Sequence, residues 1–391
     1  MMWAVSTIGE RHLRRALVGM CGTQVISWGA LYYALPVATA QIAGTTGWTP
    51  STITLAFSAG LLVAAGAGIP LGRMIDRYGP RLVMTAGSVL AAVALVLVAT
   101  APSRPLFFLA WGVVGVAQAM QLYPPAFAAI TIWYGDRRAR PLTIVTLVGG
   151  LASTVFAPLT ALLVDQVGWR ASYLVYAAVF VVVNLPVHWL LLTPAWPDHR
   201  TRPAATPVRH VTRSARFRLL QTAMTLAALG LYASAIVVVP LFVERGLSHA
   251  LAAVALGLVG AGQVLGRLVF AAVPRSSAPA ARTTGVLAAS CAALVLLALL
   301  PGPAGALLAV AVILGMARGA FTLVQATAVA DRWLTARFGA LNGLFNAPIT
   351  AATAIAPGGA IVLAERVGGY ATALILLAVL AGIAAVLAVL T

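Results

Sequence analysis

The sequence predicts an all-α membrane protein with twelve membrane-spanning helices in two six-helix bundles. The first observation is composition: 61% of the 391 residues are hydrophobic and 8% are charged, with a mean hydropathy of +0.99. Soluble domains carry about one quarter charged residues. The second observation is that apolar segments long enough to cross about 30 Å of hydrocarbon recur along the chain. These segments are solid apolar runs, whereas a membrane β-barrel would alternate with a period of two.

The apolar segments follow one another with short connections, and one longer polar stretch interrupts them. The predicted spans are 16–42, 52–72, 82–101, 105–132, 141–164, 171–192, 219–243, 250–273, 284–300, 304–330, 339–364 and 370–390. The polar stretch, 193–218, is rich in proline and arginine and reads as a linker. We therefore expect an N-terminal bundle (1–192), a cytoplasmic linker (193–218) and a C-terminal bundle (219–391). The first span is too long for the core of a cleaved signal peptide.

Charge placement predicts the topology. The 25 basic residues are all arginine and outnumber the 8 acidic residues, which gives a formal net charge of +17. With the N-terminus inside, the arginines gather on the cytoplasmic side, and the exceptions outside the helices are Arg104, Arg170, Arg245 and Arg366. This positive-inside bias predicts a bacterial inner-membrane protein with both termini in the cytoplasm, rather than a partner of nucleic acid. Membrane lipids are expected partners, although the basic run of the linker is also typical of solvated, topology-setting charge.

The sequence offers little for catalysis. The two cysteines lie in different apolar segments, the five histidines are scattered, and no metal-ligand set, nucleophile arrangement or phosphate loop is present. We therefore expect neither an enzyme nor a cofactor or metal site.

The stretch GRMIDRYGPR (72–81) connects the second and third spans. Gly72 permits close helix packing and Gly79 a tight reversal, while Asp76 can accept hydrogen bonds from a helix N-terminus or pair with an arginine. By composition alone this is also an ordinary positive-inside turn. It resembles the signature loop of the major facilitator superfamily, with Pro80 where a basic residue is usual and Ile75 where a small one is. The resemblance implies the twelve-helix fold of that family and a gating role for Gly72, Asp76, Arg77, Gly79 and Arg81.

A second stretch, WYGDRRARPLTIVTLVGGLASTVFAPLTALLVDQVGWRASY (133–173), is similar to the monocarboxylate-transporter-like branch, which includes the oxalate–formate antiporter group. The shared elements are an aromatic pair with a basic cluster, a Gly-Gly pair, Pro158 and a Gly-Trp-Arg turn. In that branch an arginine of the eighth helix contacts the substrate carboxylate. Arg267 of GQVLGRLVF (262–270) matches it, and Gln263 stands where an acid is usual. Because glutamine takes no proton and the chain has no lysine, proton coupling by the family's usual groups is not expected.

Arg318 raises a question of charge. It lies in ILGMARGAF (313–321), near the middle of the tenth span, where an arginine costs about 2.5–3.5 kcal/mol on insertion scales. All eight acids lie at predicted helix ends or in loops: Glu10, Asp76, Asp136, Asp165, Asp198, Glu244, Asp331 and Glu365. The preferred interpretation is that the opposing charge is the substrate. The alternative is an arginine satisfied by backbone carbonyls or by tyrosines.

Other polar residues are expected near mid-depth of the helices that line the central pathway in this fold. The candidates for substrate contact, beside Arg318, Arg267 and Gln263, are Trp28, Tyr32, Gln118, Gln121, Tyr232 and, less strongly, Asn346. Aromatic rings with a polar tip and neutral amides suit a small organic anion. Interhelical hydrogen bonding is the alternative for each of them.

The expected function is membrane transport of a small organic anion, a carboxylate, by alternating access, as uniport or exchange. The alternative is an efflux transporter for amphipathic drugs or toxic metabolites. A ligand sensor without transport is a third class, against which the lack of an appended signalling domain argues. The partner is a small-molecule substrate, and we expect a monomer.

Overall fold

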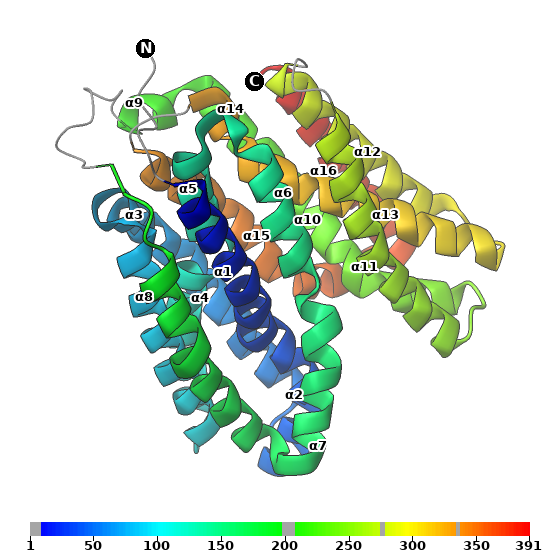
Figure 1. Ribbon diagram of the computed structural model, residues 1–391. Coiled ribbons are helices and arrows are strands. Elements are labelled where there is room, and N and C mark those ends of the chain that lie inside the picture. Colours follow the sequence, from blue (N-terminus) through cyan, green and yellow to red (C-terminus); the bar gives the residue numbers. More distant parts are fainter. Residues whose placement is uncertain (1–8, 198–207, 274–277, 334–336) are drawn as a thin grey trace. The chain divides into compact units, whose positions relative to one another are not determined.

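The computed structural model describes residues 9–197, 208–273, 278–333 and 337–391, and within these ranges the chain is helical with no β-strand (Figure 1). The contacts divide the chain into two units. Unit 1 comprises Met1–Ala205 and Thr335–Ala347, and unit 2 comprises Thr206–Leu334 and Pro348–Thr391. The boundary near residue 205 falls inside the predicted linker, whose middle (198–207) lies outside the described residues. The exact domain limits stay a prediction.

The described residues of unit 1 up to 197 form eight α-helices and three short helical turns of other types. Its elements are α1 (Glu10–Trp28), the π-helical turn η1 (Gly29–Tyr33), α2 (Ala34–Thr46), α3 (Pro50–Thr100), α4 (Arg104–Gln121), α5 (Tyr123–Tyr134), the 3₁₀ turn η2 (Gly135–Arg137), α6 (Ala139–Gly150), α7 (Ala152–Val179), the π-helical turn η3 (Phe180–Asn184) and α8 (Leu185–Leu191). The start of α15 (Phe338–Val367) also belongs to this unit, as far as Ala347.

Unit 2 contains the remaining helices of the described residues. They are α9 (Val208–Arg213), α10 (Ala215–Glu244), α11 (His249–Ala272), α12 (Pro279–Leu299), α13 (Ala304–Thr327), α14 (Ala330–Trp333), the rest of α15 from Pro348, and α16 (Tyr370–Val389). Within this unit α11 packs along α13, and α16 packs along both α12 and α10.

The number of membrane crossings follows from two glycines. Ten helical stretches of the described residues are long and apolar enough to cross a membrane, and two of them, Pro50–Thr100 and Ala139–Leu191, have 51 and 53 residues. At about 1.5 Å per residue each of these is too long for one crossing. Gly79 (φ 77°) and Gly168 (φ 80°) interrupt them with a backbone conformation that L side chains rarely adopt. Each stretch therefore holds two crossings, and the predicted all-α fold of twelve membrane helices is confirmed.

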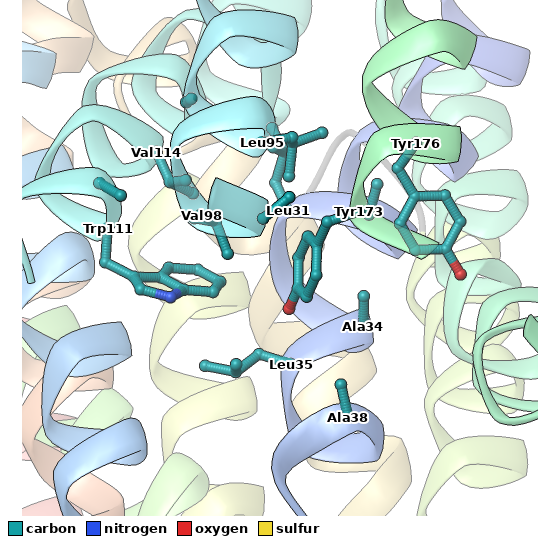
Figure 2. Packing of buried hydrophobic residues seen from close by; sticks show 14 of the residues in the cluster. Leu31, Ala34, Leu35, Ala38, Leu95, Val98, Trp111, Val114, Tyr173 and Tyr176 are labelled. Carbon is teal, nitrogen blue, oxygen red and sulfur yellow. The ribbon is translucent and has the colours of Figure 1, made fainter. Parts of the chain in front are cut away.

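The core of unit 1 is built from small, aliphatic and aromatic side chains. Figure 2 shows Leu31, Ala34, Leu35 and Ala38 along one helical segment, with Trp111 on one side and Tyr173 on the other. Leu95 and Val98 of α3 belong to the same cluster, and all of these side chains are buried. Since lipid is as apolar as these residues, close packing rather than water exclusion stabilises such a bundle.

Glycines bring the helices into backbone contact. In unit 2, Gly262 and Gly266 of α11 face Gly315 and Gly319 of α13, so that both helices present a small-xxx-small pair to the other. A Cβ atom at Gly315 would lie 2.9 Å from the Cα of Gly262. Arg267 directly follows one of these pairs and Arg318 lies inside the other, so this crossing fixes the backbones that carry both predicted arginines.

Candidate functional site

Arg318 lies near the middle of α13, and its side chain is half-buried. Its guanidinium carbon is 4.3 Å from the centre of the Tyr232 ring, which belongs to α10. In the part of the chain that the structure describes, no carboxylate and no hydrogen-bond acceptor pairs with the Arg318 side chain. The sequence left open that a tyrosine satisfies Arg318, and Tyr232 does contact it. The contact is made by the ring face, however, and the guanidinium N–H groups have no acceptor in the described residues.

Two carboxylates of the described residues bind other groups. In unit 2 Asp331 accepts a hydrogen bond of 3.0 Å from Arg282. In unit 1 the Asp76 carboxylate binds backbone N–H groups. An arginine at a membrane midplane requires an anion, a polar partner or water. Arg318 therefore has the chemistry of a binding group for a small anion, with the ring of Tyr232 fixing one face.

Arg267 lies in α11 and is 4% exposed. The residue before it, Gly266, contacts the backbone of Met316 in α13, and the backbone of Gln263 contacts Gly319. Gln263 itself is half-buried. The tight crossing of α11 and α13 therefore carries three of the unit 2 candidates, Arg267, Gln263 and Arg318, while the fourth, Tyr232, belongs to α10. The burial of Arg267 shows a side chain inside protein rather than one extended to water.

Trp28 and Tyr32 form an aromatic cluster in unit 1. Their ring centres are 5.3 Å apart, edge to face, and Trp28 also lies 4.9 Å from Tyr123. The π-helical turn η1 begins directly after Trp28, where Gly29 abuts the ring of Phe156. Single π-helical turns are frequent at functional sites. The indole N–H of Trp28 is buried and donates to no acceptor in the described residues, which leaves it available to a bound molecule.

Gln118 and Gln121 are fully buried in unit 1 and bond to neighbouring helices. The side-chain amide of Gln118 donates to the Leu31 carbonyl at 2.7 Å. The amide of Gln121 donates to the Met84 carbonyl at 2.6 Å and to the Ser88 hydroxyl at 3.3 Å. For these two residues the geometry favours interhelical hydrogen bonding, and their contact with substrate stays a prediction. Asn346 is also buried, and its amide donates to Asn342 one turn earlier in α15.

Gln121 is part of a buried chain of hydrogen-bonded polar side chains that the sequence did not reveal. His188 Nδ1 lies 2.8 Å from the Ser88 hydroxyl, which bonds to Gln121, and Gln121 accepts from Ser27 at 3.4 Å. Asn184 is the far end of the chain and donates to Ser27 at 3.1 Å. All five side chains are 0% exposed. The available signal was the spacing of Asn184 and His188, one turn apart in an apolar helix.

The predicted gating loop has a defined geometry. Asp76 is 8% exposed, and its carboxylate accepts from the backbone N–H of Gly339 at 2.7 Å and of Ala340 at 2.8 Å. Asp76 thus binds a helix N-terminus, as its charge suggests, but that of α15 rather than of the next helix in sequence. Gly72 abuts the Gly339 backbone directly. These contacts lie within unit 1.

The basic residues of the loop contact aromatic rings and helix ends. Arg81 donates from Nε to the Trp189 carbonyl at 2.8 Å, and its guanidinium lies 4.3 Å from the Trp189 ring centre. Arg77 lies 5.1 Å from the ring of Tyr78. Gly79 permits the reversal, and a Cβ there would come within 3.0 Å of the Trp196 ring.

Comparison with known proteins places these features in a family. The family model described as Major Facilitator Superfamily matches residues 20–305. An "MFS-type transporter 1" of Ophiocordyceps sp. is 25% identical over 333 residues, which are 83% of this chain and 72% of that protein. Human "Monocarboxylate transporter 11" is 27% identical over 218 residues, 54% of this chain and 46% of that protein.

A solved structure shows the same fold. The human organic anion transporter MFSD10 (TETRAN) superimposes with a TM-score of 0.78 at 16% sequence identity, covering 98% of this chain and 100% of that one. At this identity the likeness shows the fold.

Proposed function

The chain belongs to the Major Facilitator Superfamily and is a transporter, and on that premise we propose that it moves a small organic anion, a carboxylate, across the membrane. The observation that carries the proposal is Arg318: a cation in the middle of a membrane helix, held by the ring of Tyr232, with no carboxylate beside it in the described residues. A carboxylate substrate would supply the missing charge through a charge-assisted, two-pronged hydrogen bond.

Each unit contributes other groups to the proposal. Arg267 and Gln263 share the α11–α13 crossing with Arg318, and a second buried cation adds to the positive potential there. Within unit 1, the Trp28–Tyr32 cluster has aromatic rings and an indole N–H with no acceptor among the described residues, which is chemistry that suits an organic ligand. Alternating access would present these groups to the two sides of the membrane in turn.

Exchange is the mode that the charge favours over net flux. A site with a permanent positive charge is stabilised by its anion, so its return without one is costly. The protein would therefore exchange one anion for another, and the loop around Asp76 would act as a gate. The positive-inside bias supports the further proposal of a bacterial inner membrane with both termini in the cytoplasm. Robust net flux by the wild type in the absence of any counter-anion would contradict exchange.

A thermal-shift screen of the purified protein in detergent tests the proposal. The ligands are short mono- and dicarboxylates, other organic anions and lipophilic cations, and the variants are Arg318→Gln and Arg267→Gln. A ligand at 100 times its Kd adds about 2.7 kcal/mol to the stability of the folded state. We expect a carboxylate to stabilise the wild type and not Arg318→Gln. Stabilisation by lipophilic compounds alone, equal in both variants, would instead indicate efflux of amphipathic molecules.

A further inference from the structure

A basic stripe runs along the first turns of α1. Arg11, Arg14, Arg15 and Val18 are spaced so that they share one face of the helix, and all four are exposed. The buried face of α1 lies elsewhere, at positions such as Leu13 and Ala16. The stripe and Leu191 of α8 line an open groove of about 440 Å³. This volume falls in the range of small-molecule sites, roughly 300–1,000 Å³.

One wall of the groove is apolar and fixed in place. A Cβ atom at Gly19 would lie 3.0 Å from the side chains of both Leu191 and Val187, so α1 and α8 pack in close contact beside the groove. Val18 is 64% exposed and Leu190, the neighbour of Leu191, is 63% exposed. In a protein that spans a membrane such side chains face lipid chains.

Within the described residues, no carboxylate compensates the positive charge of the groove. Among the described residues no carboxylate lies within 4.0 Å of Arg11, Arg14 or Arg15, and the nearby Glu10 pairs instead with Arg137 at 3.8 Å. Like charges one turn apart on a helix repel one another. An anion between them would relieve this repulsion, and arginine forks match the oxygens of a phosphate group.

We propose that this groove binds an anionic glycerophospholipid. The phosphodiester headgroup would lie on Arg11, Arg14 and Arg15, and an acyl chain would run along Val18 and Leu191. The apolar wall is what distinguishes a lipid from a free anion: inorganic phosphate gains nothing from Val18 or Leu191, whereas an acyl chain does. This site is separate from the transport site and holds whether or not the transported substrate is a carboxylate.

Lipid titration of the purified protein tests the proposal. Phosphatidylglycerol and phosphatidylcholine with the same acyl chains are added in detergent, and native mass spectrometry counts bound lipid; glycerol 3-phosphate is the headgroup probe. The variants are R11Q/R14Q/R15Q and V18N, which leaves every charge in place. The matched control is R209Q/R213Q/R216Q, which removes three exposed arginines around α9.

We expect the wild type to bind phosphatidylglycerol in preference to phosphatidylcholine. Each arginine near an anionic lipid contributes roughly a factor of five, so R11Q/R14Q/R15Q should weaken binding at least tenfold, and the control by less than about threefold. V18N should weaken lipid binding without changing the response to glycerol 3-phosphate. Three results would each overturn the proposal. They are equal losses of binding in the triple variant and its control, no preference for the anionic lipid, and binding of glycerol 3-phosphate as tight as that of the lipid.

Discussion

Removal of the Asp76 carboxylate should destabilise the protein strongly. The carboxylate is 8% exposed and accepts two backbone N–H groups, those of Gly339 and Ala340, at 2.7 and 2.8 Å. In Asp76→Ala both donors lose their partner at the start of α15, and the negative charge at the positive end of this helix is lost. A hydrogen bond to a charged group contributes about 1.5–3 kcal/mol, and a helix cap about 0.5–2 kcal/mol.

These contributions overlap, because the two hydrogen bonds are themselves the cap, so we expect Asp76→Ala to lose about 3–4 kcal/mol of unfolding free energy. Asp76→Asn keeps one acceptor oxygen and should lose about half as much. The assay is unfolding in detergent, followed by circular dichroism. The matched control is Asp136→Ala, because the Asp136 side chain is fully exposed and lies 3.9 Å from Arg138. Unfolding of Asp76→Ala like the wild type, or equal destabilisation of Asp136→Ala, would contradict this role of the Asp76 carboxylate.

Three further changes test the packing and the site. Gly266→Leu should lower the unfolding free energy by at least about 3 kcal/mol, because the new side chain meets the backbone of Met316. Gly257→Leu is the control, since Gly257 has open space around it, and it should unfold like the wild type in the same assay. His188→Ala should lower the unfolding free energy by about 2–3 kcal/mol, because it removes the Ser88 partner and leaves a cavity at the end of the buried hydrogen-bonded chain; an unchanged melting temperature would contradict this. Tyr232→Leu should weaken anion binding about tenfold, since a cation–π contact contributes up to about 2 kcal/mol, whereas Tyr232→Phe keeps the ring and should stay within about threefold; equal affinities in titration calorimetry would exclude a role for the ring.

The fold could be predicted because its signal is the hydropathy of whole segments. Each predicted span is helical over most of its length, and the observed bounds differ by a few residues, as in 219–243 against Ala215–Glu244 and 250–273 against His249–Ala272. Hydropathy falls where a helix leaves the membrane, but helical hydrogen bonding continues beyond that point. The same reason explains why two pairs of spans are joined into longer helical stretches, each across a glycine with positive φ, Gly79 or Gly168.

The site could be predicted only in part, because hydropathy does not tell which way a polar residue points. The contact of Arg318 with Tyr232 agrees with their expected proximity, but Gln118 and Gln121 have backbone and side-chain partners inside the bundle. In a membrane helix, the face that is buried in protein and the face that contacts lipid are both apolar. The periodicity of the sequence therefore gives little information on which side of the helix faces the interior.

Contacts between residues far apart in the chain also could not be predicted from the sequence. Asp76 was expected to bind a helix N-terminus, but nothing in its neighbourhood indicates Gly339, 263 positions away. The hydrogen-bonded chain that ends at His188 joins α1, α3, α4, η3 and α8, and each member taken alone is an isolated polar residue in an apolar run. Only the three-dimensional arrangement shows that they are partners.

Counterflow in proteoliposomes tests the central claim, that Arg318 is the counter-charge of an anionic substrate. Vesicles loaded with an unlabelled carboxylate that stabilises the wild type are diluted into a trace of the same labelled anion, with wild type, Arg318→Gln and the exposed-site control Arg209→Gln compared at equal protein. We predict rapid accumulation of label by the wild type and the control, and a loss of at least about tenfold in Arg318→Gln, which corresponds to about 1.4 kcal/mol. Undiminished counterflow by Arg318→Gln would contradict the account.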